Sequence, residues 1–108
     1  MAVKDVRFTE FTRKTAQQVK PTGSFNPGDA VLIHVNVPAN ASRLLILVAQ
    51  VLSDADMTLS LNGQRKGGLQ SVSYTVKKPA AGDYTAILTA DGPVHDVNVH
   101  ATVVTSDK

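Results

Sequence analysis

Two aspartates lie close together where they could share a metal ion or act as an acid pair. Asp54 and Asp56 are two positions apart and precede the alternating stretch 57–61. Side chains two positions apart in a strand project to the same side, so both carboxylates could face one ion. A calcium site needs about six to eight oxygen ligands, and a glycosidase needs its two carboxylates in a cleft. The sequence supplies neither the further oxygen ligands nor the cleft. We therefore interpret the two aspartates as turn formers, and they are also the only metal candidates in the sequence.

The three histidines have none of the spacings that mark a metal or catalytic site. His34 and His100 have the parity of residues that face away from the core, whereas His95 has inward parity near a strand start. No His-x-His pair, HExxH or Gly-x-Ser-x-Gly motif occurs. The chain has no cysteine, which excludes a disulfide, a thiolate zinc site and a cysteine nucleophile. We therefore predict no enzyme and no cofactor.

Two further motifs indicate turns. Pro79 and Gly82 precede Tyr84 in the manner of a tyrosine corner, in which the ring packs inside and the hydroxyl bonds upstream backbone. We predict a structural role for these three residues. Arg65 and Lys66 stand before two glycines with no helix behind them, so we expect a hairpin loop with solvated charges.

The elements that must position these residues are strands. Apolar and polar residues alternate with period two in several short stretches, which are 31–37, 57–61, 72–76 and 97–103. The stretch 44–52 is apolar on both faces, which predicts a central strand covered on both sides. Turn residues recur every 8–14 positions or so, and Asn62-Gly63 is a hairpin signal. The sequence thus predicts an all-β fold, a single sandwich of jelly-roll or immunoglobulin-like type with about seven to eight antiparallel strands.

Residues 1–24 break this pattern and are rich in charge. We expect them to form an arm or an edge strand, followed by the sandwich domain at 25–108. Aromatic and basic side chains would let such an arm dock on an acidic surface. The residues expected to contact a partner are Arg7, Phe8, Phe11, Arg13 and Lys14.

Length and composition narrow the partner classes. The chain has 108 residues, the size of one domain, with 11 basic and 9 acidic side chains and 5% aromatic residues. This small basic excess and low aromatic content argue against a nucleic-acid partner. The longest apolar run is too short to span a membrane, and the first residues do not resemble a signal peptide. We expect no membrane partner. We also expect either that the protein is made and used without export, or that Met1 was added to a domain excised from a longer protein.

The order of strands and turns over residues 36–90 resembles the bacterial pre-peptidase C-terminal domain. The matching positions are Asp54 or Asp56, Leu59, Leu61, Pro79, Gly82 and Tyr84. The resemblance implies a jelly-roll-like sandwich without catalysis and an accessory role beside something larger. The chain departs from that setting, because from the sequence we expect neither a peptidase domain nor a signal peptide.

These observations favour a structural or interaction protein that docks on a larger assembly. A decoration or cement protein on a phage capsid is the example we expect, made in the bacterial cytoplasm and present in several copies or as a homo-oligomer on the virion surface. The alternative is an extracellular accessory module cut from a longer enzyme or adhesin. That module would bind calcium, glycan or protein through the loops around Asp54 and Arg65.

Overall fold

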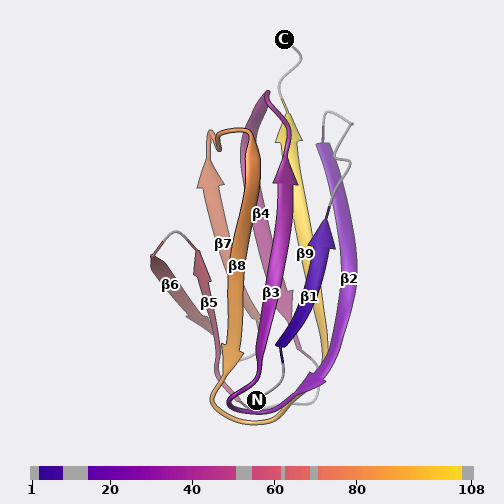
Figure 1. Ribbon diagram of the computed structural model, residues 1–108, viewed down its shortest axis with the longest axis vertical. Coiled ribbons are helices and arrows are strands. Elements are labelled where there is room, and N and C mark those ends of the chain that lie inside the picture. Colours follow the sequence, from indigo (N-terminus) through magenta and orange to yellow (C-terminus); the bar gives the residue numbers. More distant parts are fainter. Residues whose placement is uncertain (1–2, 9–14, 51–54, 62, 69–70, 106–108) are drawn as a thin grey trace.

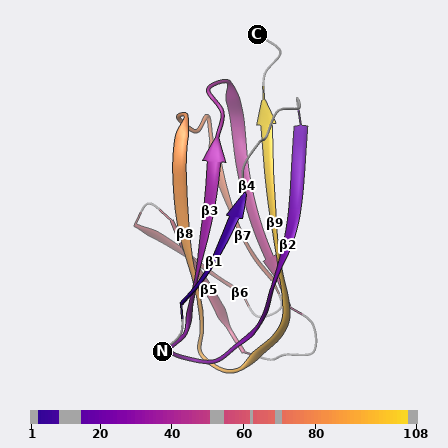
Figure 2. The ribbon, with the colours of Figure 1, turned by 45° about the vertical axis from the view of Figure 1, so that its right-hand side comes forward.

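The chain folds into two packed β-sheets (Figure 1 and Figure 2). The computed structural model describes residues 3–8, 15–50, 55–61, 63–68 and 71–105. The described residues form nine strands and no helix, so the predicted all-β sandwich is confirmed with slightly more strands than expected. No helix with the length and apolar character to cross a membrane occurs in this part of the chain.

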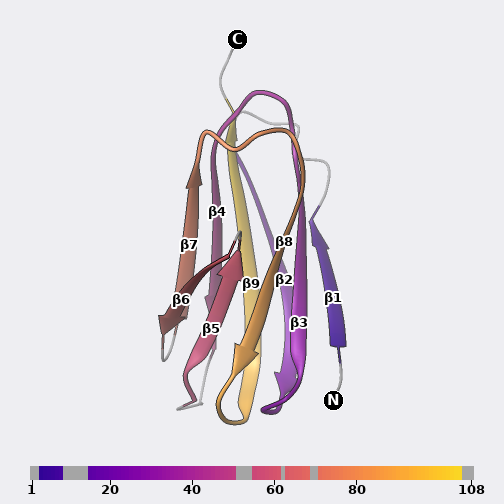
Figure 3. The same cartoon turned by 60° about the vertical axis from the view of Figure 1, so that its left-hand side comes forward.

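Each sheet mixes strands from distant parts of the sequence. The five-stranded sheet faces the viewer in Figure 1 and contains, in spatial order, β1 (Val3–Phe8), β3 (Ala30–Val37), β8 (Gly82–Ala90), β5 (Met57–Leu61) and β6 (Gln64–Gly68). The four-stranded sheet lies behind it and contains, in spatial order, β2 (Thr15–Phe25), β9 (Val94–Thr105), β4 (Ala41–Ala49) and β7 (Ser71–Lys77). The two ends of the sheets, β1 beside β2 and β6 beside β7, form the open sides of the sandwich (Figure 3).

The alternating stretches place their apolar side chains between the sheets, as predicted. The inward residues of β3, β5 and β9 are buried, and they are Val31, Ile33, Val35, Val37, Met57, Leu59, Leu61, Val97, Val99, Ala101 and Val103. Burying one such side chain contributes roughly 1.5–3 kcal/mol. Because the side-chain period of a strand is two, the residues between them must face outward and are available to a partner.

The expectation that residues 44–52 are covered on both sides is wrong for β4. Leu44, Ile46 and Val48 are fully buried, but Leu45 and Leu47 on the outer face are only half-buried. β4 is central because β9 and β7 flank it within the sheet, and no described strand lies over its outer face. An apolar run therefore marked a strand central in its sheet, not one enclosed between layers.

The N-terminal segment is built into both sheets. β1 pairs with β3 in parallel, although only antiparallel strands were predicted, because the chain visits the other sheet as β2 before it returns as β3. Val6 and Phe8 point into the core, and Phe8 is fully buried. The prediction that Phe8 contacts a partner is therefore wrong, since its ring already fills the chain's own interior.

Two lysines close the open side between β1 and β2. The Lys4 ammonium donates to the carbonyls of Thr22 and Ser24 at 3.0 and 3.1 Å. From the opposite strand, Lys20 donates to the carbonyl of Arg7 and lies 5.5 Å from the centre of the Phe8 ring. Charged side chains at a sheet edge satisfy free backbone groups and discourage the addition of another strand.

The other open side is closed by the β5–β6 hairpin. Leu61 pairs with Gln64 at the position of the predicted hairpin, and Gly63 has a φ of 78°, whereas Asn62 lies outside the described residues. The Tyr74 hydroxyl on β7 donates to the Gln64 side-chain oxygen at 3.0 Å. At the other end of β6, a Cβ on Gly68 would collide with the Ser71 carbonyl, so only glycine lets β6 approach β7 this closely.

Replacing Phe8 tests whether β1 belongs to the folded core. Phe8→Ala should lower the free energy of unfolding by about 3–5 kcal/mol, because it leaves a cavity beneath the edge of the five-stranded sheet. Chemical denaturation measures the loss. Val3→Ala is the matched control on the same strand, since Val3 is 55% exposed and should change stability little. A Phe8→Ala variant as stable as Val3→Ala would contradict this placement.

Neighbouring glycines on β6 provide a second matched pair. Gly68→Ala should cost about 1–3 kcal/mol, because the added methyl group meets Ser71 backbone, which cannot move without disturbing β7. Gly67→Ala should be close to neutral, since its Cβ would make ordinary contact with the Met57 carbonyl oxygen at 3.8 Å. Equal stability of the two variants in thermal and chemical denaturation would disprove the close approach of β6 to β7.

Candidate functional site

The outer face of the five-stranded sheet carries one row of side chains that runs across every strand. The pairing registers align Asp5 on β1, Leu32 on β3, Ile87 on β8, Ser60 on β5 and Arg65 on β6. We call these five residues the central row. Strands lie about 4.8 Å apart, so the row spans about 19 Å. Its ends are charged and its middle is apolar, with Ile87 43% exposed.

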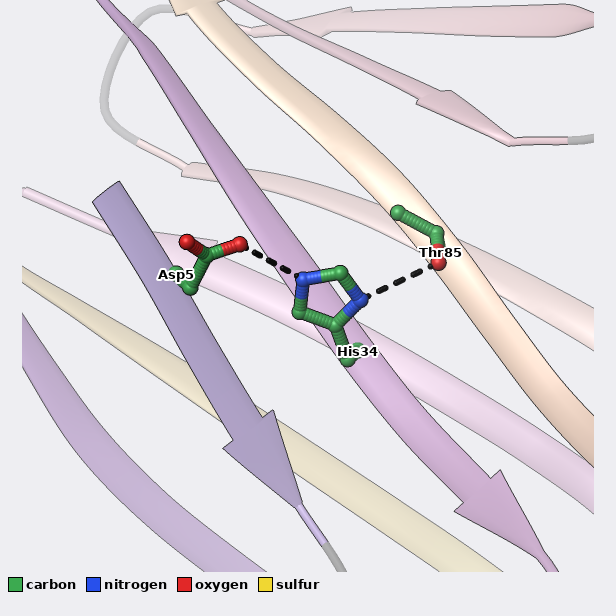
Figure 4. A network of polar contacts seen from close by, with 3 residues as sticks. All are labelled: Asp5, His34 and Thr85. Atoms are coloured by element: carbon green, nitrogen blue, oxygen red, sulfur yellow. Dashed lines mark hydrogen bonds and ion pairs between the residues drawn. The ribbon is translucent and has the colours of Figure 1, made fainter. Parts of the chain in front are cut away.

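A second row lies two residues away and contains a polar network. We call Arg7, His34 and Thr85 the histidine row, since the registers align them across β1, β3 and β8. His34 Nε2 lies 2.8 Å from the Asp5 carboxylate of the central row, and His34 Nδ1 lies 3.2 Å from the Thr85 hydroxyl (Figure 4). A neutral imidazole satisfies both contacts if Nε2–H donates to Asp5 and Nδ1 accepts from Thr85.

The side chains of Asp5, His34 and Thr85 have the composition of a hydrolytic triad, but their geometry and exposure are different. In a Ser-His-Asp triad the carboxylate is buried and holds Nδ1, while Nε2 takes the hydroxyl proton. Here the two nitrogens have exchanged partners, and the side chains of Asp5 and His34 are 49% and 22% exposed. Electrostatic catalysis depends on a water-excluded site with aligned donors. On this open face the network instead ties β1, β3 and β8 together.

A shallow hollow lies beside the network. It has a volume of about 350 Å³ and is lined by Ser60, Leu61, Gly63, Arg65, Thr85 and Ile87. Thr85 belongs to both the hollow and the histidine row, so the two features form one continuous surface. Its walls combine an aliphatic surface from Ile87 with hydroxyl and guanidinium donors. Such a mixture suits a side chain with an apolar stem and a polar end.

The predicted metal candidates do not form a site among the described residues. Asp54 lies outside the described ranges, and the Asp56 side chain is exposed. The backbone N–H of Asp56 donates to the Asp91 carboxylate at 2.8 Å, and the N–H of Asp91 donates to the Asp56 carbonyl at 3.0 Å. In the described part of the chain, no three His, Cys, Asp or Glu side chains converge as metal ligands would. Asp56 thus forms part of the turn between strands.

The remaining predicted contact residues are divided. Arg7 is exposed on β1 in the histidine row, whereas Phe11, Arg13 and Lys14 lie outside the described residues. Arg65, expected in a mobile loop, lies on β6 in the central row. The structure therefore brings Arg7 and Arg65 onto one face, a juxtaposition that their sequence positions do not suggest.

The predicted turn and the other histidines lie away from this face. Pro79 is buried, and the Tyr84 hydroxyl donates to the Ala80 carbonyl at 3.1 Å, the upstream bond of a tyrosine corner. His95 is exposed, with Nδ1 3.3 Å from the Ser24 hydroxyl, and His100 is half-buried on β9. The bonds of Tyr84 and His95 lie at a turn and at the start of β9, away from the two rows.

Sequence analysis did not identify the residues at the centre of the face. Leu32 and Ile87 looked like ordinary members of apolar strands, and nothing connected Asp5 or Thr85 with His34. The available signal was an apolar residue at an outward position, which applies to both Leu32 and Ile87 once strand parity is known. Which outward residues share a row depends on the pairing registers, which are non-local.

Comparison with known proteins finds relatives in fold only. No family model and no curated protein matches the chain. Similar solved structures include PliG, a periplasmic inhibitor of g-type lysozyme from Aeromonas hydrophila. The match has 15% identity, covers 94% of this chain and 96% of that one, and has a TM-score of 0.56. Another is CorA, a surface-associated copper-binding protein of Methylomicrobium album BG8, at 8% identity, 95% and 100% coverage and a TM-score of 0.59.

A third similar structure bears on the resemblance found in the sequence. The pre-peptidase C-terminal domain of the Bacillus anthracis collagenase matches with 14% identity over 93% of each chain, at a TM-score of 0.53. The predicted resemblance to this domain is confirmed, and it extends beyond residues 36–90 to nearly the whole chain. At these identities the comparisons establish a shared β-sandwich fold.

Proposed function

We propose that this protein is a non-enzymatic module that binds another protein through the outer face of its five-stranded sheet. The observation that carries the proposal is the central row, with Leu32 and the exposed Ile87 in its middle and charged side chains at its ends. Protein interfaces combine an apolar centre with a polar rim in this way, and a few central side chains supply most of the binding energy.

A protein partner suits this face better than a glycan or a nucleic acid. None of the described side chains in the two rows is a Phe, Tyr or Trp, so the face lacks the broad aromatic rings on which sugars and bases most often stack. The polar side chains of the histidine row, beside Ile87, can instead hydrogen-bond a protein segment. Support also comes from the similar fold of PliG, whose described role is to inhibit another protein, a lysozyme.

We further propose that this module binds in many copies to a larger assembly such as a phage capsid, at the virion surface. One small domain with an amphipathic sheet face is sufficient for such a decorating role. The arm-based docking expected from the sequence is replaced by docking through the sheet face, because Phe8 is buried and β1 belongs to the sandwich. Measuring the mass of the native particle that contains this protein tests this proposal. A protein that occurs natively only as a monomer, and never as part of a larger particle, would contradict it.

Site-specific crosslinking tests the binding face. With a photoreactive phenylalanine analogue at position 87, the chain expressed in its source organism should give one discrete adduct. The same analogue at position 19 is the matched control, because Val19 is 51% exposed on the other sheet. Excess wild-type chain should suppress the adduct, and excess Leu32→Glu chain should not. Absence of an adduct at 87, or the same adducts from both positions, would refute the proposal.

A hydrolysis assay tests the non-enzymatic part. Wild-type protein, His34→Gln and Thr85→Val should hydrolyse p-nitrophenyl acetate at the same rate, because the open network lacks a water-excluded site. Thermal denaturation confirms that the variants are folded. A rate that falls about tenfold or more in both variants would show that the network acts as a nucleophile and base.

A further inference from the structure

On the binding face, the carboxylates have partners among the described residues, whereas the guanidinium groups do not. Its carboxylates already have partners within the chain, since Asp5 contacts His34 and Asp83 accepts from the Asn36 amide, each at 2.8 Å. Asn36 and Asp83 are paired across β3 and β8, one row beyond the histidine row. The negative charges of this face are therefore committed within the chain.

The guanidinium groups of the face are available. Within the described ranges, the side chains of Arg7 and Arg65 make no ion pair or hydrogen bond with another described residue. They occupy opposite edges of the sheet, Arg7 on β1 and Arg65 on β6. Each guanidinium has five N–H donors in a planar fork that fits a carboxylate through two parallel bonds. The face thus offers unmatched donors at both ends of an apolar middle.

We propose that the binding face takes an acidic segment of the partner protein, an inference that rests on the proposed function. One carboxylate of the segment would pair with Arg65, while its aliphatic stem enters the hollow against Ile87 and Leu61. A second carboxylate would reach Arg7 on the far side of the sheet. Apolar side chains between the two acidic residues would cover Leu32 and Ile87.

The spacing of the face limits the form of that segment. Arg7 and Arg65 are four strand spacings apart and two residues out of line along the strands, about 20 Å in all, and an extended chain rises about 3.3 Å per residue. An extended segment therefore needs acidic residues about six positions apart, with alternate apolar side chains between them on the same side. A basic segment would leave Arg7 and Arg65 facing like charge, which opposes binding.

A pair of synthetic peptides tests this chemistry. The probe is the capped heptapeptide Glu-Thr-Val-Thr-Val-Thr-Glu, and its control has glutamine in place of both glutamates. In an amide NMR titration, the acidic peptide should shift the signals of Ser60, Arg65, Thr85 and Ile87, and the glutamine peptide should bind about tenfold or more weakly.

Matched arginine variants assign the effect to the face. Arg65→Gln should weaken binding of the acidic peptide about tenfold. Arg43→Gln, which removes an exposed arginine from β4 on the other sheet, should leave it unchanged. Equal binding of both peptides, no shift with either, or equal loss in both variants would overturn the acidic partner. The crosslink from position 87 tests the binding face independently of the peptide titration. The acidic partner and the binding face can therefore be disproved separately.

Discussion

The register in which β8 pairs with its two neighbours is the constraint on which the rest of this surface depends. Ile87 lies opposite Leu32 on β3 and Ser60 on β5, and these pairings hold the central row in line. A slip of one residue would turn Ala86 and Leu88 outward and bury Ile87. The core prevents this slip, because Ala86 and Leu88 are fully buried between the sheets. Tight packing on the inner face thus fixes the order of side chains on the outer face.

Closure of the two open sides protects this arrangement. Between β1 and β2, Lys4 and Lys20 bond carbonyls on the opposite strand. Between β6 and β7, Tyr74 bonds Gln64. The lysines occupy backbone carbonyls of β1 and β2, and charged side chains at such edges disfavour the addition of another strand.

Much of the fold follows from local sequence, whereas the site does not. Period-two alternation identified the core faces of β3, β5 and β9, because within each strand alternate apolar residues face the core and the residues between them face outward. The N-terminal segment was harder to predict, since Phe8 is buried only when β1 lies beside β3, and parallel pairing leaves no turn signal in the sequence. The contacts of His34 join residues 29 and 51 positions away, and no motif spacing encodes such a cross-strand network.

The parallel pairing of β1 with β3 also has a consequence for the order of events during synthesis. The central row draws on residues from position 5 to position 87, so its first member is made long before the strand that completes it. Pairings between distant segments form slowly, because the ends of a long loop must first meet. A nascent or partly folded chain therefore cannot display the complete row. Recognition through this row, as we propose it, would require the finished sandwich, which would prevent premature association while the chain is still being made.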